Sequence, residues 1–112
     1  MWNLIFFKEN DNCYAIEFIL LQKDPAVRVQ LEAALDRLEI EGNRLEFPQV
    51  RPLGNGLYEL REHRKKVQYR FYYFFDKNEI IVTHGWISNH KKENEQIKFA
   101  QRCRNSHLGR KE

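Results

Sequence analysis

Apolar and polar side chains alternate along residues 57–63 and again along residues 68–75. Because successive side chains of a β-strand point to opposite faces, this alternation predicts two strands, each with a mainly apolar or aromatic face and a mainly polar face. The residues between the strands are basic. A four-residue connection (64–67) and a two-residue connection (65–66) give the same antiparallel register, so the predicted pairing holds for both.

This register places Arg61 directly opposite Arg70 on the polar face. Two like charges directly across a strand pair repel each other, so the pair indicates either a neighbouring carboxylate such as Glu59 or an anion that binds both arginines. Phosphate is the obvious candidate for that anion. Four further side chains are expected on the same face: Glu59, His63, Gln68 and Tyr72.

A turn after the second strand leads to a third predicted strand, residues 80–86. Pairing Phe75 with Ile80 extends the register and divides the side chains between two faces. Arg70 then falls opposite Gly85, which leaves room for a ligand beside it. The open face is expected to hold Arg61, Arg70, Tyr72 and Thr83. The face that helices cover is expected to hold Phe71, Tyr73, Phe75, Ile80, Val82, His84 and Trp86.

Two helices are predicted before these strands. Asp24 is a good N-cap and Pro25 a favourable first helical residue, and the apolar residues that follow recur at helical spacing up to Gly42, which suits a left-handed helix end. Residues 13–22 contain no helix breaker and are predicted as a shorter helix capped by Asn12, although periodicity alone also allows a strand. The two helices should form a hairpin that covers one face of the sheet.

The remaining segments complete one domain, residues 1–112. Residues 2–7 are aromatic and branched and predict a first strand. Residues 44–55 contain two prolines and a glycine and are predicted to be mostly a connecting loop. Apolar residues at spacing three predict a terminal helix from Ile97 onward, with a frayed tail after Asn105.

Charge is distributed unevenly along the chain. Residues 1–43 carry four Lys/Arg and eight Asp/Glu, a net charge of −4, whereas residues 44–112 carry fifteen and eight, a net charge of +7. A basic surface in the C-terminal two thirds favours a polyanion such as nucleic acid as partner, although a solvated basic face is nearly as common. No apolar run is long enough to cross a bilayer, so we expect a cytoplasmic protein that does not bind a membrane.

Cofactor motifs are absent from the sequence: it has no GxGxxG, P-loop, HExxH or GxSxG. We therefore expect no cofactor. The two cysteines lie at opposite ends of the chain and the histidines do not recur at ligand spacing, so no metal site is predicted. His84 belongs to the predicted core face, whereas His63 and His90 are better placed as proton-transfer groups.

Three strings in succession, PLGNGLYELREH, YRFYYFF and IIVTHGWI, are followed by a lysine-containing loop and a helix. With this pattern the chain resembles the HigB/RelE-type toxins of bacterial and phage toxin–antitoxin pairs. The resemblance covers most of the chain and is strongest over residues 52–86. It implies a RelE-like α+β fold: an N-terminal helical hairpin on one face of a twisted antiparallel sheet, made mixed by the N-terminal strand, plus a C-terminal helix. The active site is expected on the other face.

The resemblance also implies an activity: entry into the ribosomal A site, cleavage of mRNA, and silencing by a cognate helix-turn-helix antitoxin. In RNA cleavage by 2′-hydroxyl attack, the enzyme must hold the phosphate in line and stabilise its growing negative charge. Arg61 and Arg70 can do this. Tyr72 or an aromatic neighbour could stack on a base or act in proton transfer. The other side chains expected to contact RNA are Lys65, Lys66, Lys91 and Thr83.

The chain departs from the family pattern after the third strand. The toxins that it resembles carry two consecutive lysines there and a further lysine before the last helix. In this chain Ser88 and Asn89 take the first two positions, His90 the next, and Lys92 fits the later lysine. The candidate proton-transfer groups are therefore Lys92 with His63 or His90. The alternative is a non-catalytic or ParE-like member of the fold that acts by protein binding, as a topoisomerase inhibitor or a decayed toxin.

Overall fold

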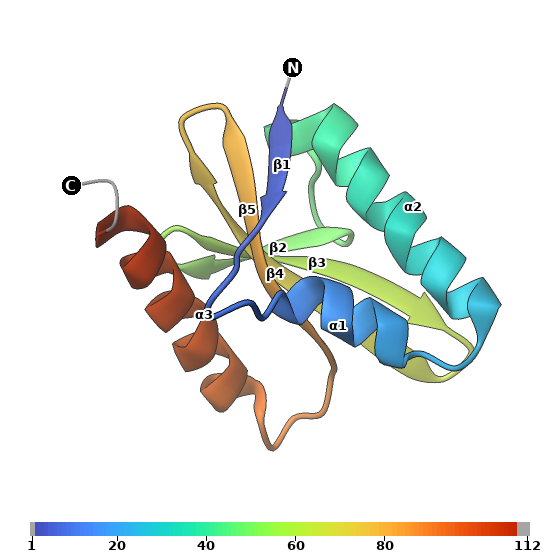
Figure 1. Ribbon diagram of the computed structural model, residues 1–112. Coiled ribbons are helices and arrows are strands. Elements are labelled where there is room, and N and C mark those ends of the chain that lie inside the picture. Colours follow the sequence, from blue (N-terminus) through green and yellow to red (C-terminus); the bar gives the residue numbers. More distant parts are fainter. Residues whose placement is uncertain (1, 110–112) are drawn as a thin grey trace.

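The computed structural model describes residues 2–109 and shows an α+β fold of three helices and a five-stranded mixed sheet (Figure 1). Its elements, in chain order, are β1 (Asn3–Phe6), α1 (Tyr14–Leu21), α2 (Pro25–Glu41), the 3₁₀ turn η1 (Gly42–Arg44), β2 (Val50–Gly54), β3 (Leu57–Arg64), β4 (Val67–Asp76), β5 (Glu79–Ile87) and α3 (Glu93–Gly109).

The strand order in the sheet is β1-β5-β4-β3-β2. The first strand pairs in parallel with β5, and the other neighbours pair antiparallel, which confirms the expected mixed sheet. Both hairpins that flank β4 have two-residue connections, with Lys65 and Lys77 in left-handed conformations. The predicted pairing of the two central strands is confirmed, because Arg61 lies opposite Arg70.

Helices α1 and α2 cover one face of the sheet, as predicted. Asp24 caps α2 by accepting a hydrogen bond from the Ala26 backbone N–H at 2.9 Å, and Pro25 is the first helical residue. Gly42 ends the helix with φ +55°, and a Cβ at this position would lie 1.9 Å from the Trp2 ring, so only glycine fits there. The predicted cap of α1 is wrong. Its N-cap residue is Cys13 rather than Asn12, and Glu17 accepts a hydrogen bond from the Cys13 backbone N–H.

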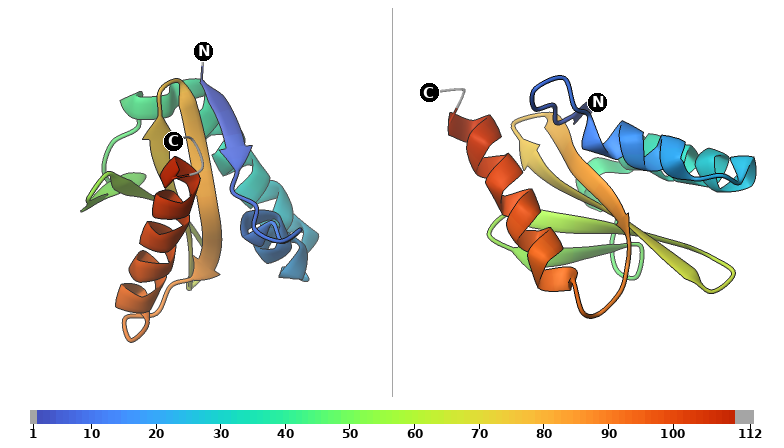
Figure 2. Two further views of the ribbon diagram at one scale, coloured as in Figure 1. Left: turned by 60° about the vertical axis from the view of Figure 1, so that its left-hand side comes forward. Right: turned by 60° about the horizontal axis from the view of Figure 1, so that its bottom comes forward.

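Helix α3 covers part of the opposite face, so that face is less open than predicted. The left view of Figure 2 shows the sheet lying between α3 and the α1/α2 pair. Ala100 and Cys103 of α3 are buried against Tyr72, Phe74 and other side chains of this second core. The helix also continues through residues 106–109, which were expected to be frayed, because it stays packed on the sheet. The rest of that predicted tail, residues 110–112, lies outside the described residues.

The register between β4 and β5 is only partly as predicted. Phe75–Ile80 and Tyr73–Val82 are partners, but a bulge at the next step pairs Tyr72 with His84 rather than with Thr83. The extra residue reverses the faces to which the following side chains of β5 point. The partner of Arg70 is therefore Trp86 instead of Gly85. The side chains of His84 and Trp86 lie on the α3 side, so their predicted place under α1 and α2 is wrong.

The segment expected to be mostly loop contains a fourth antiparallel strand, β2, at the edge of the sheet. An edge strand tolerates proline because one side of its backbone has no neighbour to bond, which explains Pro52 within β2.

Among the described residues, no helix combines the length and the apolar character that crossing a membrane requires.

Candidate functional site

The arginine pair lies near the end of the β3–β4 hairpin, on the face that α3 only partly covers. Glu59 lies two residues before Arg61 on β3, so their side chains share a face. Its carboxylate is only 3% exposed. Its Oε1 atom lies 3.6 Å from the Nε of Arg61 and 3.6 Å from the Nε of Arg70. Two arginines directly opposite each other were expected to need either a neighbouring carboxylate or a bound anion. The structure supplies the carboxylate, that of Glu59.

Arg70 is held as part of the fold. Its side chain is 7% exposed, and its guanidinium donates to the backbone oxygen of Tyr69 at 2.9 Å and to Gln68 Oε1 at 3.3 Å. Burial lowers the pKa of Arg70, Glu59 opposes this, and the positive charges of Arg61 and Arg51 lower it further. An arginine stays protonated despite such a shift, so Arg70 supplies a fixed positive charge beneath the surface.

Arg61 is the more accessible partner. Its side chain is 31% exposed, and its Cζ lies 5.7 Å from the centre of the Phe47 ring. Within residues 2–109, its terminal guanidinium nitrogens have no hydrogen-bond partner. Arg61 can therefore present two N–H-bearing nitrogens to a ligand while its Nε stays near Glu59.

Arg51 of β2 also reaches Glu59, with Nε and Oε1 3.3 Å apart, and it forms a second ion pair with Glu93 at the start of α3. Burial lowers the pKa of Arg51, but the hydrogen bond to Glu93 and the charges of both carboxylates outweigh it and raise the pKa. This chain of charges ties β2, β3 and α3 together. Sequence reasoning missed the role of Arg51, because pairing it with Glu59 requires β2 to be recognised as a strand.

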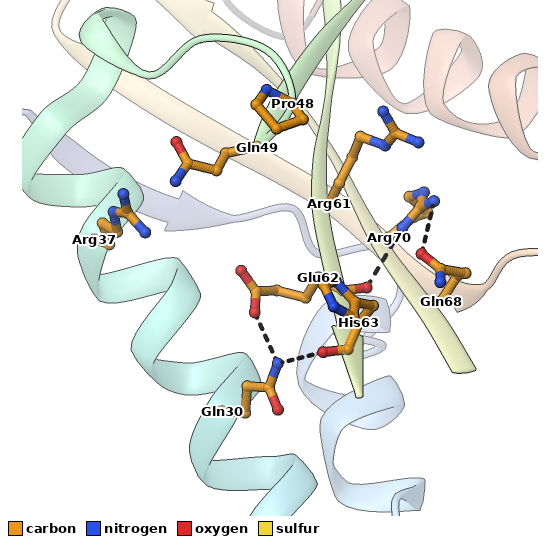
Figure 3. A pocket seen from close by; sticks show the side chains of 9 residues that line it. All are labelled: Gln30, Arg37, Pro48, Gln49, Arg61, Glu62, His63, Gln68 and Arg70. Carbon is orange, nitrogen blue, oxygen red and sulfur yellow. Dashed lines mark hydrogen bonds between the residues drawn. The ribbon is translucent and has the colours of Figure 1, made fainter. Parts of the chain in front are cut away.

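A cavity of about 390 Å³ opens beside the arginines, between α2, the residues that lead into β2, and the edge of β3 (Figure 3). Gln30 of α2 closes one side by donating from its amide to Glu62 Oε1 and to the backbone oxygen of His63, both at 2.9 Å. All of the cavity's lining residues except Pro48 are polar or charged, and arginines outnumber carboxylates among them. Its lining residues are Gln30, Arg37, Pro48, Gln49, Arg61, Glu62, His63, Gln68 and Arg70.

The family model of the phage-derived Gp49-like proteins (DUF891) matches residues 19–104, which is most of the chain. The chain belongs to the Gp49-like family. This is a family of RelE/HigB-like toxins, so the resemblance seen in the sequence is confirmed at the level of the family. Membership is consistent with a role as the toxin of a toxin–antitoxin pair. Searches among curated proteins and among solved structures gave no significant match.

The structure of this Gp49-like protein brings three of the predicted catalytic residues together, since Arg61, Arg70 and His63 all line the cavity. The other two, His90 and Lys92, do not line it. They lie on the exposed segment between β5 and α3, where Lys92 directly precedes Glu93, the ion-pair partner of Arg51. Of the predicted RNA-binding lysines, Lys65 and Lys66 form the exposed β3–β4 turn, and Lys91 is exposed beside Lys92.

Two predicted RNA contacts are not on the surface. Tyr72 and Thr83 are both fully buried, because α3 covers this part of the sheet. The Thr83 hydroxyl donates to the Tyr72 backbone oxygen at 3.2 Å, and burial raises the pKa of the Tyr72 hydroxyl. Tyr72 therefore has no free face on which a base could stack, and Thr83 belongs to the bulge that re-aims His84.

His84 is a buried histidine on the α3 side of the sheet. It is 5% exposed, and its Nε2 lies 2.8 Å from Gln96 Oε1. Burial lowers its pKa to about 4, against a smaller opposing effect of the Gln96 hydrogen bond, so the ring is neutral at pH 7.

A separate cluster of titratable side chains lies at the far end of β4. There Asp76, Glu79 and His107 form the one group in residues 2–109 whose ligand atoms are close enough to share a metal ion.

Proposed function

We propose that this Gp49-like protein is a toxin that cleaves mRNA on the ribosome, by attack of a 2′-hydroxyl on the adjacent phosphodiester. The observation that carries the proposal is the pair formed by Arg61 and Arg70, which face each other at a polar cavity. One arginine is fixed in the fold and the other is accessible, so together they suit an oxyanion that bridges them.

The charges around Glu59 support phosphate binding. Three guanidiniums, of Arg51, Arg61 and Arg70, stand against the two carboxylates of Glu59 and Glu93, which leaves one positive charge in excess. A phosphodiester carries one negative charge in the ground state and gains more as the 2′-oxygen attacks. A site that holds positive charge in place before reaction stabilises this gain without reorganising.

The reaction also needs two proton transfers. The 2′-hydroxyl loses its proton as its oxygen bonds to phosphorus, and the 5′-oxygen gains a proton as its bond to phosphorus breaks, which gives a 2′,3′-cyclic phosphate and a 5′-hydroxyl. His63 is the candidate that already lines the cavity. His90 and Lys92 can take part when RNA spans the distance between the cavity and the segment before α3. No metal is required by this mechanism.

Contacts to the RNA backbone come from exposed lysines on two sides of the site. Lys65 and Lys66 lie on the β3–β4 turn, and Lys91 lies on the segment before α3. Lysines in such positions neutralise phosphates without reading sequence, as binding to a ribosome and its mRNA requires. The partners in this proposal are the ribosome, mRNA and a cognate helix-turn-helix antitoxin that silences the toxin.

Primer extension on an mRNA in a purified translation system tests the proposal. The wild-type protein should produce cuts at fixed positions within codons, and only when ribosomes translate the message. Arg61→Ala should lower the cutting by about 100-fold, the effect expected from loss of one positioned charge donor. The matched control is Arg44→Ala, which removes an exposed arginine paired with Glu41. Undiminished cutting by both Arg61→Ala and Arg70→Ala would contradict the mechanism.

A second candidate is a non-catalytic or ParE-like member of the fold that acts by binding a protein. It is favoured by Glu59, whose carboxylate already occupies the space between the arginines, and by Ser88 and Asn89 where lysines are expected. This candidate predicts no cuts in mRNA, with growth arrest if the protein inhibits a topoisomerase and no growth arrest if it is a decayed toxin. A supercoiling assay with purified gyrase then separates a topoisomerase inhibitor from a decayed toxin.

A further inference from the structure

Phe47 is a large aromatic side chain left at the surface beside the arginine pair. It is 71% exposed, and within residues 2–109 it is the only aromatic member of the exposed large apolar side chains. The guanidinium carbon of Arg61 lies 5.7 Å from its ring centre. The two residues that follow it, Pro48 and Gln49, line the cavity. Phe47 thus stands at the entrance of the proposed phosphate site.

The backbone holds this segment in place on the sheet. The Gln49 N–H donates to the Glu46 oxygen at 3.0 Å, and the Gln49 oxygen accepts from the Arg61 N–H at 2.8 Å. Phe47 and Arg61 are therefore fixed relative to each other through the main chain as well as through their side chains. An exposed ring on a fixed backbone loses little conformational freedom when a flat ligand stacks on it.

We propose that Phe47 is a stacking platform for one unpaired nucleobase of single-stranded RNA whose phosphate lies at Arg61 and Arg70. The inference rests on the proposed function, because it takes the arginine pair as the phosphate site. Single-stranded RNA is held by aromatic rings that stack on its bases together with cations that follow its backbone. Phe47 supplies the ring, and Arg61 supplies the cation beside it. Tyr72, for which this role was expected, is buried.

Gln49 gives the same subsite a group that can read the edge of the base. Its side chain lines the cavity and extends toward α2 and Arg37 (Figure 3). Its amide has no hydrogen-bond partner within residues 2–109, whereas the Gln30 amide across the cavity is already bonded to Glu62 and His63. A glutamine amide offers one donor and one acceptor side by side, which matches the edge of adenine. Other bases also present a donor beside an acceptor when they are unpaired, so Gln49 can hold a stacked base by its edge.

The surroundings of Phe47 favour a nucleobase over an apolar protein surface. The exposed apolar residues Leu20 and Leu21 lie next to each other on α1, where a protein partner would find a continuous patch. In the chain Phe47 stands between the exposed residues Glu46 and Pro48, and the cavity that Pro48 lines carries three arginines. A flat ring that carries a phosphate fits this mixture of one aromatic face and several cations.

The test uses a short 2′-O-methyl RNA that cannot be cleaved by 2′-hydroxyl attack, with 2-aminopurine at one position. Stacking quenches the fluorescence of 2-aminopurine, so the wild-type protein should bind and quench it. Phe47→Ala and Phe47→Leu should bind about tenfold more weakly and lose the quenching, whereas Phe47→Tyr should stay within about twofold of wild type. Val29→Ala removes an exposed apolar residue from α2 and is the matched control.

An oligonucleotide with an abasic site completes the design, because it has the same charge but no base to stack. The wild type should bind the abasic strand about tenfold more weakly than the intact strand. Phe47→Ala should bind the two strands with equal affinity. Equal affinity of wild type and Phe47→Ala for the intact strand, or failure of the wild type to quench 2-aminopurine, overturns the proposal. Loss of antitoxin binding in Phe47→Ala with RNA binding unchanged would assign Phe47 to a protein interface instead.

The experiments distinguish failure of the base-stacking proposal from failure of the endoribonuclease proposal. If the wild type binds and quenches the oligonucleotide but makes no cuts in translated mRNA, the base subsite stands and the endoribonuclease proposal fails. If translated mRNA is cut equally by wild type and Phe47→Ala and the abasic strand binds as well as the intact one, the enzyme stands and the subsite fails. Gln49→Ala should weaken binding of the oligonucleotide while leaving the quenching in place.

Discussion

Arg61 and Arg70 face each other directly across β3 and β4, although two like charges in that relation repel. Glu59 accounts for the arrangement, because its Oε1 atom lies 3.6 Å from the Nε of each arginine. The pair is unequal in exposure. Arg70 is embedded in the fold and Arg61 is open to solvent, so substitution of the two should separate activity from stability.

Arg61→Ala should impair cleavage much more than folding. Its ion pair with Glu59 is partly exposed, so its loss should lower the free energy of unfolding by less than about 1 kcal/mol. Urea denaturation of the purified protein measures this change, and primer extension measures cleavage. A large shift in the urea midpoint would assign Arg61 a structural role instead.

Arg70→Ala should destabilise the protein. It removes a buried charge that bonds the backbone oxygen of Tyr69 and leaves Glu59 with two partners instead of three. Breaking a buried pair typically costs about 3–5 kcal/mol, and we expect the lower end because Arg51 and Arg61 remain. Arg70→Lys keeps the charge but loses the planar fork, so it should fall between wild type and alanine. An unchanged urea midpoint for Arg70→Ala would contradict this view of the site.

Glu59→Gln should strengthen RNA binding while it weakens the fold. The substitution keeps the size of the side chain but raises the excess charge of the cluster from one to two, so phosphate no longer competes with a carboxylate for the arginines. Binding of the uncleavable oligonucleotide should tighten and depend more steeply on salt concentration. Glu41→Gln, which removes the exposed partner of Arg44, is the control and should change neither property. Weaker binding by Glu59→Gln would mean that the carboxylate orients the arginines for the ligand.

The central hairpin was predictable because most of its positions alternate and both possible turn lengths give one register. The register of β5 was predictable only as far as Tyr73 and Val82, since the bulge that follows turns His84 and Trp86 to the other face. Residue types carry no mark of this bulge. Both faces of the sheet are covered by helices, so an aromatic side chain is buried on either side.

The other misses have related causes. The prolines that suggested a loop before residue 56 are compatible with an edge strand, and without β2 the contact of Arg51 with Glu59 could not be foreseen. The covering of Tyr72 depends on where α3 packs. Periodicity predicts that a helix has an apolar stripe, but not which part of the sheet the stripe will contact.

Gly85→Ala should destabilise the protein, because this glycine fits under α1 rather than beside a ligand. A Cβ at Gly85 would lie 2.4 Å from Phe18 Cδ2 and 2.8 Å from Phe71 Cε1. Overpacking of this kind typically costs about 1–3 kcal/mol. Gly109→Ala is the matched control, since nothing lies within 4 Å of its Cβ position. Thermal denaturation of both variants tests the prediction, and equal melting temperatures would contradict it.

His84 should make the stability of the protein depend on pH. Burial between the rings of Tyr72 and Phe99 lowers its pKa to about 4, below its ordinary value of 6.5, so the unfolded chain binds a proton more readily than the folded one. The contribution of the neutral His84 ring to the free energy of unfolding is fully present above pH 6.5. It is lost as the pH falls from 6.5 toward 4. The loss should reach up to about 3 kcal/mol at the acidic end. Urea denaturation between pH 7.5 and 4.5 measures it, and His84→Gln should flatten the profile. Parallel profiles for wild type and His84→Gln would show that other groups govern the acid sensitivity.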